Sequence, residues 1–120
     1  MTDNYRARTL PHLEKLGLSY VVVDEPQGFR SSRSPVVAAT SPLAVVRFHG
    51  HNAETYEKPN ITAAERFRYL YTEEELKGWV APIRRLAEQA DRVHVLMNNC
   101  YGDYGVRNAR QLAELLAGQT

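Results

Sequence analysis

The sequence predicts an α/β fold with a parallel sheet, because segments rich in β-branched residues alternate with amphipathic helical segments. The segment 43–48 has no plainly polar side before Arg47, so both of its faces are expected to be covered by helices, as in a parallel sheet. Three segments have a convincing strand pattern, which suits half of a barrel or a small open sheet.

The N-terminal part predicts a helix and then the first strand. Residues 1–8 are a polar lead-in, and the helix is expected over 9–16. Pro11 is tolerated in its first turn, and Gly17 is a natural left-handed stop. A buried strand is expected over 18–23, with Asp24 at its carboxyl end.

The middle of the chain contains the central strand between two loops. A polar loop is expected over 27–35, and residues 36–40 are either a short strand or an extended lead-in. The central strand is expected over 43–48. Residues 53–71 are too aromatic for a simple linker, so we expect a lid or long loop that folds back over the sheet.

A long helix is predicted from Thr72, because Thr72 and Glu75 form a capping box. Pro82 lies inside this helix and should kink its axis. Its apolar residues recur at helical spacing, and they are Leu76, Trp79, Val80, Ile83, Leu86, Ala87 and Ala90.

A third buried strand is expected over 92–97, with His94 packed inside and the pair Asn98-Asn99 at the carboxyl end. A polar turn at 101–105 then leads into a last helix. The apolar stripe of that helix consists of Val106, Ala109, Leu112, Leu115 and Leu116.

Length and composition limit the classes of protein that fit. The 120 residues suffice for one domain, and the formal net charge of +1 argues against a strongly charged partner surface. The lone Cys100 cannot form an intrachain disulfide, which fits a reducing, cytoplasmic setting. The sequence has no run long enough to span a membrane and no signal-peptide pattern, so we expect no membrane partner.

Polar residues from distant segments are expected to meet at one edge of the sheet, because parallel strands end on the same side. They are Asp24, Arg47, His49, Asn98, Asn99, Arg107 and Asn108. One interpretation is a pocket for an anionic or hydroxylated ligand. The other is a buried salt bridge between Asp24 and Arg47, with asparagines that cap turns.

The pair His49-x-His51 is weak evidence for a metal, since no carboxylate or cysteine has matching spacing, and we predict no metal site. The alternative is one histidine hydrogen-bonded inside and the other exposed. The sequence identifies no cofactor and has no glycine-rich phosphate loop.

Five motifs occur in a fixed order along the chain. They are Val23-Asp24-Glu25-Pro26, Val46-Arg47-Phe48-His49-Gly50-His51-Asn52, Arg68-Tyr69-x-Tyr71 with Glu74-Glu75-Leu76, Asn98-Asn99, and Asn108-Ala109-x-x-Leu112. Their order and spacing resemble the YecE-like family, also called domain of unknown function 72, over nearly all residues from Gly17 to Leu116. The family usually has arginine where this chain has His51.

The resemblance implies a TIM-type (β/α) barrel with the motifs at its carboxyl-end face, and no established reaction. It covers only the C-terminal half of the family, since a complete barrel needs eight strands in roughly 250 residues. We therefore expect residues 1–120 to form a single partial domain, either a truncated or split gene product or part of a longer protein. Half a barrel leaves edge strands and an uncovered inner face, so Val45 and Leu96 should face water or a neighbour. Self-association or a complementary N-terminal half is then expected.

Three functional hypotheses follow. In the first, the barrel fragment binds or converts a small anionic or polyhydroxylated ligand, with Arg47 on the anion, His49 as general acid or base, and Asp24 orienting one of them. The further ligand-binding candidates, which would donate hydrogen bonds, are Asn52, Asn98, Asn99 and Asn108. The second is a nucleic-acid-binding or phosphodiester-processing module that uses Arg30 and Arg33. The third is a half-barrel that is inactive without a partner.

Overall fold

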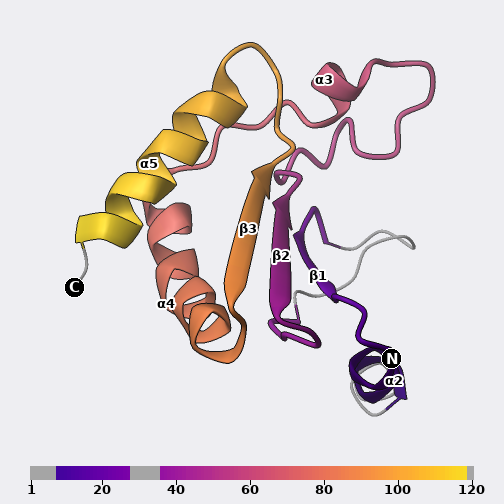
Figure 1. Cartoon of the computed structure of the whole chain (residues 1–120). Helices are drawn as coiled ribbons and strands as arrows, with labels where there is room; N and C mark the ends of the chain where they lie inside the picture. Colours follow the sequence, from indigo (N-terminus) through magenta and orange to yellow (C-terminus); the bar gives the residue numbers. More distant parts are fainter. Residues whose placement is uncertain (1–7, 28–35, 119–120) are drawn as a thin grey trace.

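A parallel sheet of three strands forms the centre of the molecule (Figure 1). The computed structural model describes residues 8–27 and 36–118. The strands are β1 (Val21–Asp24), β2 (Leu43–Phe48) and β3 (Arg92–Met97), in the order β1-β2-β3. The predicted α/β class and the parallel direction of all three strands are confirmed. Most of the predicted loop 27–35, with Arg30 and Arg33, lies outside the described residues.

The strand register brings the three carboxyl ends to one edge. Asp24 of β1 aligns with Phe48 of β2, and Phe48 aligns with Met97 of β3. One residue further on, the His49 amide donates to the Asp24 carbonyl and the Asn98 amide donates to the Phe48 carbonyl, both at 2.8 Å. Asp24, His49 and Asn98 thus lie side by side, as predicted, and we call this edge the rim.

The first strand is shorter than predicted, because residues 18–20 bond to a side chain rather than to a strand. The Thr40 hydroxyl accepts from the Tyr20 amide and donates to the Leu18 carbonyl. Residues 36–40 are therefore an extended lead-in and not a strand. Before them, α2 (Leu10–Leu16) ends at Gly17 in the left-handed region (φ 71°), as expected.

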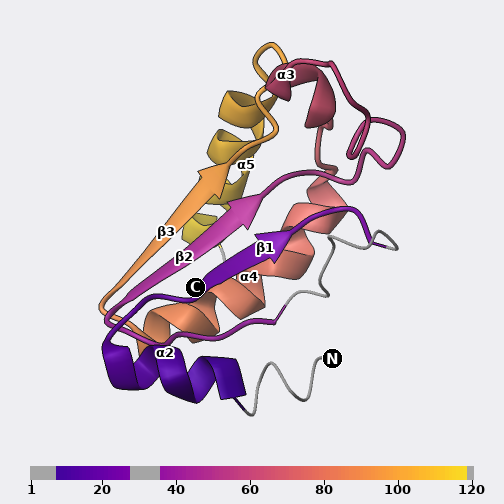
Figure 2. The same cartoon turned by 90° about the vertical axis from the view of Figure 1, so that its right-hand side faces the viewer.

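Two long helices, α4 (Glu73–Gln89) and α5 (Tyr104–Gly118), cover one face of the sheet (Figures 1 and 2). The predicted capping box of Thr72 and Glu75 begins α4, and Pro82 lies within it. The residues buried between this face and the helices are Val22, Ala44, Val46, Phe48, Leu76, Ile83, Leu86 and Leu112. Burial of such side chains provides most of the stability of the fold.

Parts of both predicted stripes are exposed. In α5, Asn108 and Leu112 are buried and define the inner side, whereas Val106 is 64% exposed. Val106 precedes Asn108 by two positions and so points almost to the opposite side of a helix with 3.6 residues per turn. Ala109, like Ala87 of α4, is also exposed, so each predicted apolar stripe extends beyond the buried side of its helix.

The other face of the sheet is not covered within the described residues. Figure 2 looks onto the sheet with α4 and α5 behind it. We call this side the open face, and its residues are Val21, Val23, Leu43, Val45, Arg47, Arg92, His94 and Leu96. The prediction that β3 is buried on both sides and that His94 is packed was wrong, because among the described residues β3 is an edge strand with one uncovered face.

The long connection between β2 and α4 passes beyond the rim and carries the short helix α3 (Ala63–Arg66) (Figures 1 and 2). It returns to the core at Tyr71, which is only 2% exposed. This matches the expected long loop. Among the helices of the described ranges, none combines the length and apolarity needed to cross a membrane.

Candidate functional site

The carboxylate of Asp24 has two side-chain partners at the rim. It is buried, and its Oδ2 accepts from the Tyr71 hydroxyl at 2.8 Å and lies 2.8 Å from Nε2 of His51. The Tyr71 hydroxyl in turn accepts from the Gly50 amide at 2.8 Å. Burial, followed by the Asp24 charge, raises the pKa of Tyr71 far above its usual value, so this hydroxyl remains a donor.

Asp24 does not pair with Arg47. Successive side chains of a strand alternate between faces, and Asp24 shares its face with Val22, whereas Arg47 aligns with Val23. The predicted alternative of a buried Asp24–Arg47 salt bridge is therefore wrong. The partners of Asp24, which are His51 and Tyr71, come from the segments that follow β2.

His51 bridges two carboxylates. Its Nε2 faces Asp24, and its Nδ1 lies 2.9 Å from Oε2 of Glu75 at the start of α4. The hydrogen bond to Asp24 raises the pKa of His51 most, against the effect of burial, and Glu75 adds to the increase. Because both ring nitrogens are engaged, neither is available to a metal. The described residues contain no group of three or more potential metal-binding side chains.

Glu75 connects this network to the helix. Burial alone would raise the pKa of Glu75, but hydrogen bonds from Thr72 and Tyr69, together with His51, outweigh burial and lower it. Tyr69 donates to the same Oε2 at 2.7 Å, and burial together with Glu75 raises the pKa of Tyr69 to about 12. The capping carboxylate of α4 is thus also part of the rim.

A second group of side chains, Arg47, His49 and Asn98, lies on the open side of the rim. We orient the Asn98 amide with its oxygen toward Arg47, because the reverse would set its NH₂ group against guanidinium donors. The oxygen then accepts from Nη2 of Arg47 at 2.5 Å and from Nε at 3.1 Å. The same end of the amide is 3.5 Å from Nδ1 of His49.

His49 is held as a neutral base. Its ring is half-buried and stacks on Phe67, with 4.9 Å between the ring centroids. Burial, followed by the charge of Arg47, lowers the pKa of His49. Among the described residues no hydrogen bond engages its Nε2, and no carboxylate forms an ion pair with Arg47. A cation and a free imidazole nitrogen therefore lie together on the open side.

Three of the predicted ligand-binding asparagines bond to the chain itself. The fully buried Asn108 accepts from the Tyr71 amide at 2.9 Å and donates to the Tyr71 carbonyl at 3.1 Å. Asn99, also fully buried, donates to the Tyr69 carbonyl and to Asn108. Asn52 donates to the Arg68 carbonyl. The structure therefore groups Asn98 with Arg47 and His49 and places the other three in the frame around them.

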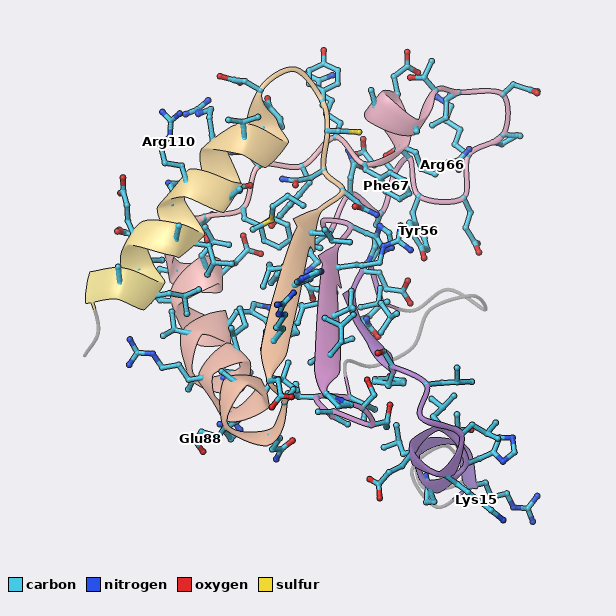
Figure 3. The ribbon with its side chains drawn as sticks, viewed as in Figure 1. Lys15, Tyr56, Arg66, Phe67, Glu88 and Arg110 are labelled. Atoms are coloured by element: carbon cyan, nitrogen blue, oxygen red, sulfur yellow. The ribbon has the colours of Figure 1, made fainter. Side chains whose placement is uncertain are left out.

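The loop beyond the rim is tied to it through side chains that Figure 3 labels. Tyr56 donates to Oε2 of Glu25 at 2.7 Å, and Arg66 donates to the Tyr56 carbonyl at 2.7 Å. Next to these hydrogen bonds lies an open hollow of about 260 Å³. It is lined by Asp24, Glu25, Pro26, Gln27, His51 and Ala53. Carboxylates therefore border one side of the rim, and Arg47 borders the other.

Several residues of the site were not predicted to bind anything. His51 was considered as half of a weak metal pair and as a departure from the family motif. Tyr71 and Phe67 were placed in the segment expected to be a lid or long loop, and Glu75 was predicted as a capping residue. The sequence signal that could have indicated these residues was the motif Tyr69-x-Tyr71 next to the capping box. Nothing local in it indicates that the tyrosine hydroxyls turn toward the rim.

Comparison with known proteins gives consistent results. The sequence profile described as "Protein of unknown function DUF72" matches residues 1–120. The UPF0759 protein YunF of Bacillus subtilis (strain 168) is 34% identical over 113 residues, which are 91% of this chain and 40% of YunF. The crystal structure of a DUF72 family protein from Thermotoga maritima MSB8 has a TM-score of 0.81 and 34% identity, with 91% of this chain and 40% of that one covered.

A DUF72 family protein from Enterococcus faecalis V583 also has this fold, with a TM-score of 0.83, 28% identity, and coverage of 95% of this chain and 42% of that one. The chain thus spans about 40% of the length of the relatives that it matches. The three-stranded parallel unit corresponds to a part of their structure.

Proposed function

This chain belongs to the DUF72 family of proteins of unknown function, and from that premise we propose that its rim binds a small anionic or polyhydroxylated ligand. The observation that carries the proposal is the Arg47 guanidinium, which has no ion pair among the described residues. It lies at the carboxyl end of a parallel sheet, where α/β folds place their ligands.

The guanidinium of Arg47 has N–H donors that Asn98 does not use. Of its five N–H groups, Asn98 occupies one at Nε and one at Nη2. The remaining donors suit a carboxylate or phosphate, which accept from arginine in pairs. A half-buried cation without a counter-ion is costly, and a bound anion relieves that cost.

His49 supplies proton chemistry next to the anion. Its Nε2 is not bonded within the described residues, and Arg47 helps to keep the ring neutral. An anion on Arg47 would remove that effect, so binding should favour proton uptake by His49. The ring is then placed to act as general acid or base toward the bound ligand.

Asp24 has a supporting role in this proposal. Its carboxylate holds His51 and Tyr71, and its carbonyl holds the His49 amide. Within the described residues, the Asp24 carboxylate forms no hydrogen bond with the His49 side chain, which a catalytic dyad would require. Asp24 therefore positions the strand end from which His49 projects.

The test is an NMR titration of the chain with inorganic phosphate and with ribose 5-phosphate. Arg47→Ala should weaken binding of both at least tenfold while the free energy of unfolding changes by only about 1 kcal/mol, because no buried ion pair is broken. The exposed Arg85 of α4 provides the matched control, and Arg85→Ala should leave binding unchanged. Equal affinity in Arg47→Ala and the unsubstituted chain would refute the proposal.

A third arm of the titration uses a single-stranded oligonucleotide. The proposal expects weak binding to it, because the net charge is only +1. Tight binding with a steep salt dependence would favour the phosphodiester hypothesis instead.

A further inference from the structure

The imidazole of His51 lies between two carboxylates and has a ring nitrogen against each of them. We propose that His51 is a positioning residue, which in its cationic form holds the turn that carries His49 and so keeps the proposed anion site in its binding arrangement. This inference rests on the proposed function, because it concerns the control of the same site. It implies that anion binding weakens when His51 loses its charge.

The geometry of the bridge requires a proton on each nitrogen. A neutral imidazole has one donor nitrogen and one acceptor nitrogen, whereas a carboxylate only accepts. Nε2 lies 2.8 Å from Oδ2 of Asp24, and Nδ1 lies 2.9 Å from Oε2 of Glu75. Both contacts are hydrogen bonds only when both nitrogens are donors. The two distances therefore assign the bridging His51 as an imidazolium cation.

The groups that face this ring from β1, α4 and the connection between β2 and α4 cannot replace the lost proton. Tyr71 already donates to the same Asp24 oxygen at 2.8 Å. Tyr69 already donates to the same Glu75 oxygen at 2.7 Å. Glu25 adds a further carboxylate to the hollow that the ring lines. Deprotonation would thus leave a nitrogen lone pair against a carboxylate, which is unfavourable.

The bridge also holds the turn from which His49 projects. The His49 amide donates to the Asp24 carbonyl at 2.8 Å. The Gly50 amide donates to the Tyr71 hydroxyl, also at 2.8 Å. Gly50 has a φ of 87° and, as a glycine, imposes little preference of its own on the backbone. The direction of the turn therefore depends on these contacts and on the return of the His51 side chain to Asp24.

Through Glu75, the bridge connects this turn to the start of α4. The Asp24 side chain is 8% exposed, and the Glu75 side chain is 27% exposed. An unpaired carboxylate costs more when it is more deeply buried, so a neutral His51 keeps its one proton toward Asp24 and gives up the bond to Glu75. The connection that leads into α4 includes Phe67, whose ring stacks on that of His49 with 4.9 Å between the centroids. Loss of the bond to Glu75 therefore loosens the stack that holds the His49 ring.

The pH range of this control follows from the surroundings of the two histidines. The hydrogen bond to Asp24 contributes most to raising the pKa of His51 above 6.5. The bridge is therefore complete below about pH 6.5 and is lost as the pH rises through the raised pKa. Burial, followed by the charge of Arg47, lowers the pKa of His49, so His49 titrates on the acidic side of 6.5. The two histidines thus affect the site in separate pH ranges.

The experiment is an NMR titration of the whole chain with sulfate, at constant ionic strength, between about pH 6.5 and pH 9. Sulfate is the probe because its charge does not change in this range. Its affinity should fall about fivefold or more as the pH rises, which is the size of a typical coupling between two sites. Because coupling is reciprocal, saturation with sulfate should also raise the pKa at which the His51 ring protons titrate.

Three variants separate the role of His51 from a general effect of charge. His51→Arg keeps a cation with several donors at every pH used, so the affinity should stay high across the range. His51→Gln cannot donate to both carboxylates and should bind weakly throughout. His12→Gln is the matched control, since His12 is an exposed histidine of α2, and it should retain the pH profile of the unsubstituted chain.

A second measurement needs no ligand and uses the unsubstituted chain, so it does not depend on the folding of a variant. Nuclear Overhauser effects between the rings of His49 and Phe67 should weaken as His51 titrates. If they do so while sulfate binds at no pH, the proposed anion site is wrong and the positioning role of His51 stands. Ring contacts that do not change, a sulfate affinity that is constant above about pH 6.5, or a decline that persists in His51→Arg would overturn the inference.

Discussion

The hydroxyl of Tyr71 donates to the carboxylate of Asp24 at 2.8 Å, although the two residues are 47 positions apart. The same oxygen accepts from the Gly50 amide, so it joins the end of β1 to the turn after β2. Nearly all of this tyrosine is buried, and its ring packs edge-on against Phe48. Tyr71 therefore links the rim to the core.

Tyr71→Phe should destabilise the fold by about 1–3 kcal/mol, because it leaves a buried carboxylate and a buried amide without their shared partner. Urea denaturation measures this change. Tyr104→Phe is the control, since no hydrogen bond engages the Tyr104 hydroxyl among the described residues and its ring packs against that of Tyr101. Its effect should stay within about 0.5 kcal/mol. Similar losses for the two variants would contradict the role assigned to the Tyr71 hydroxyl.

The free energy of unfolding should depend on pH through two histidines, whose pKa values are shifted in opposite directions. The pKa of His51 is raised above 6.5, so its contribution is complete below about pH 6.5 and is lost as the pH rises through the raised pKa. The pKa of His49 is lowered, so its contribution is complete above about pH 6.5 and is lost as the pH falls through the lowered pKa.

Denaturation of the chain at several pH values between 5 and 9 checks this expectation. His51→Gln should flatten the decline on the alkaline side, and His49→Gln should reduce the decline on the acidic side. Because the pKa of Glu75 is lowered, a further loss is expected in stronger acid. An unchanged alkaline limb in His51→Gln would show that the bridge does not form in solution.

Gly50→Ala should be among the most damaging single substitutions. Gly50 has a φ of 87°, and an added Cβ would lie 2.6 Å from Cβ of Tyr69. The backbone strain costs about 1–2 kcal/mol, and the clash adds to it. Gly17→Ala is the matched control, because Gly17 has a φ of 71° with no atom within 4 Å of the added Cβ. Thermal unfolding should show a clearly larger loss at Gly50, and equal losses would contradict the close approach of Tyr69.

Asn108→Ala should cost about 2–5 kcal/mol, since it leaves both backbone groups of Tyr71 without a partner and removes one of the two hydrogen bonds of the Asn99 amide. Gln111→Ala serves as the control, because within the described part of the chain the Gln111 side chain makes a single hydrogen bond, which it accepts from Asn108. Chemical denaturation of the two variants decides the point. A mild Asn108→Ala would mean that water replaces the lost bonds.

The parts of the fold that follow from local pattern were predictable. The bounds of β2 and β3 and the Thr72–Glu75 box were predicted as found, because periodicity and capping depend on neighbours in sequence. The rim followed from topology, since parallel strands end together. The pairing of Asp24 depended on a choice of face that alternates at every residue. The salt bridge with Arg47, one of the two alternatives left open, placed Asp24 on the wrong face.

The contacts of the connecting loop were beyond a prediction from sequence. His51 reaches both Asp24 and Glu75 only because the chain between β2 and α4 returns along a particular path. Likewise, His94 has a buried-strand sequence around it, and only the absence of a covering layer within the described residues leaves it exposed.

Because Asn108 hydrogen-bonds to the backbone of Tyr71, the order of synthesis limits when the rim can form. Tyr71 leaves the ribosome before its partner, which lies 37 positions later in the chain. At about 5–20 residues per second the delay lasts on the order of seconds. During that time the ends of β1 and β2 have been made, but the end of β3 is still to come, and the backbone groups of Tyr71 lack Asn108. The rim can therefore form completely only after the first turns of α5 emerge from the ribosome. A nascent chain that stalls earlier would expose an incomplete rim to chaperones.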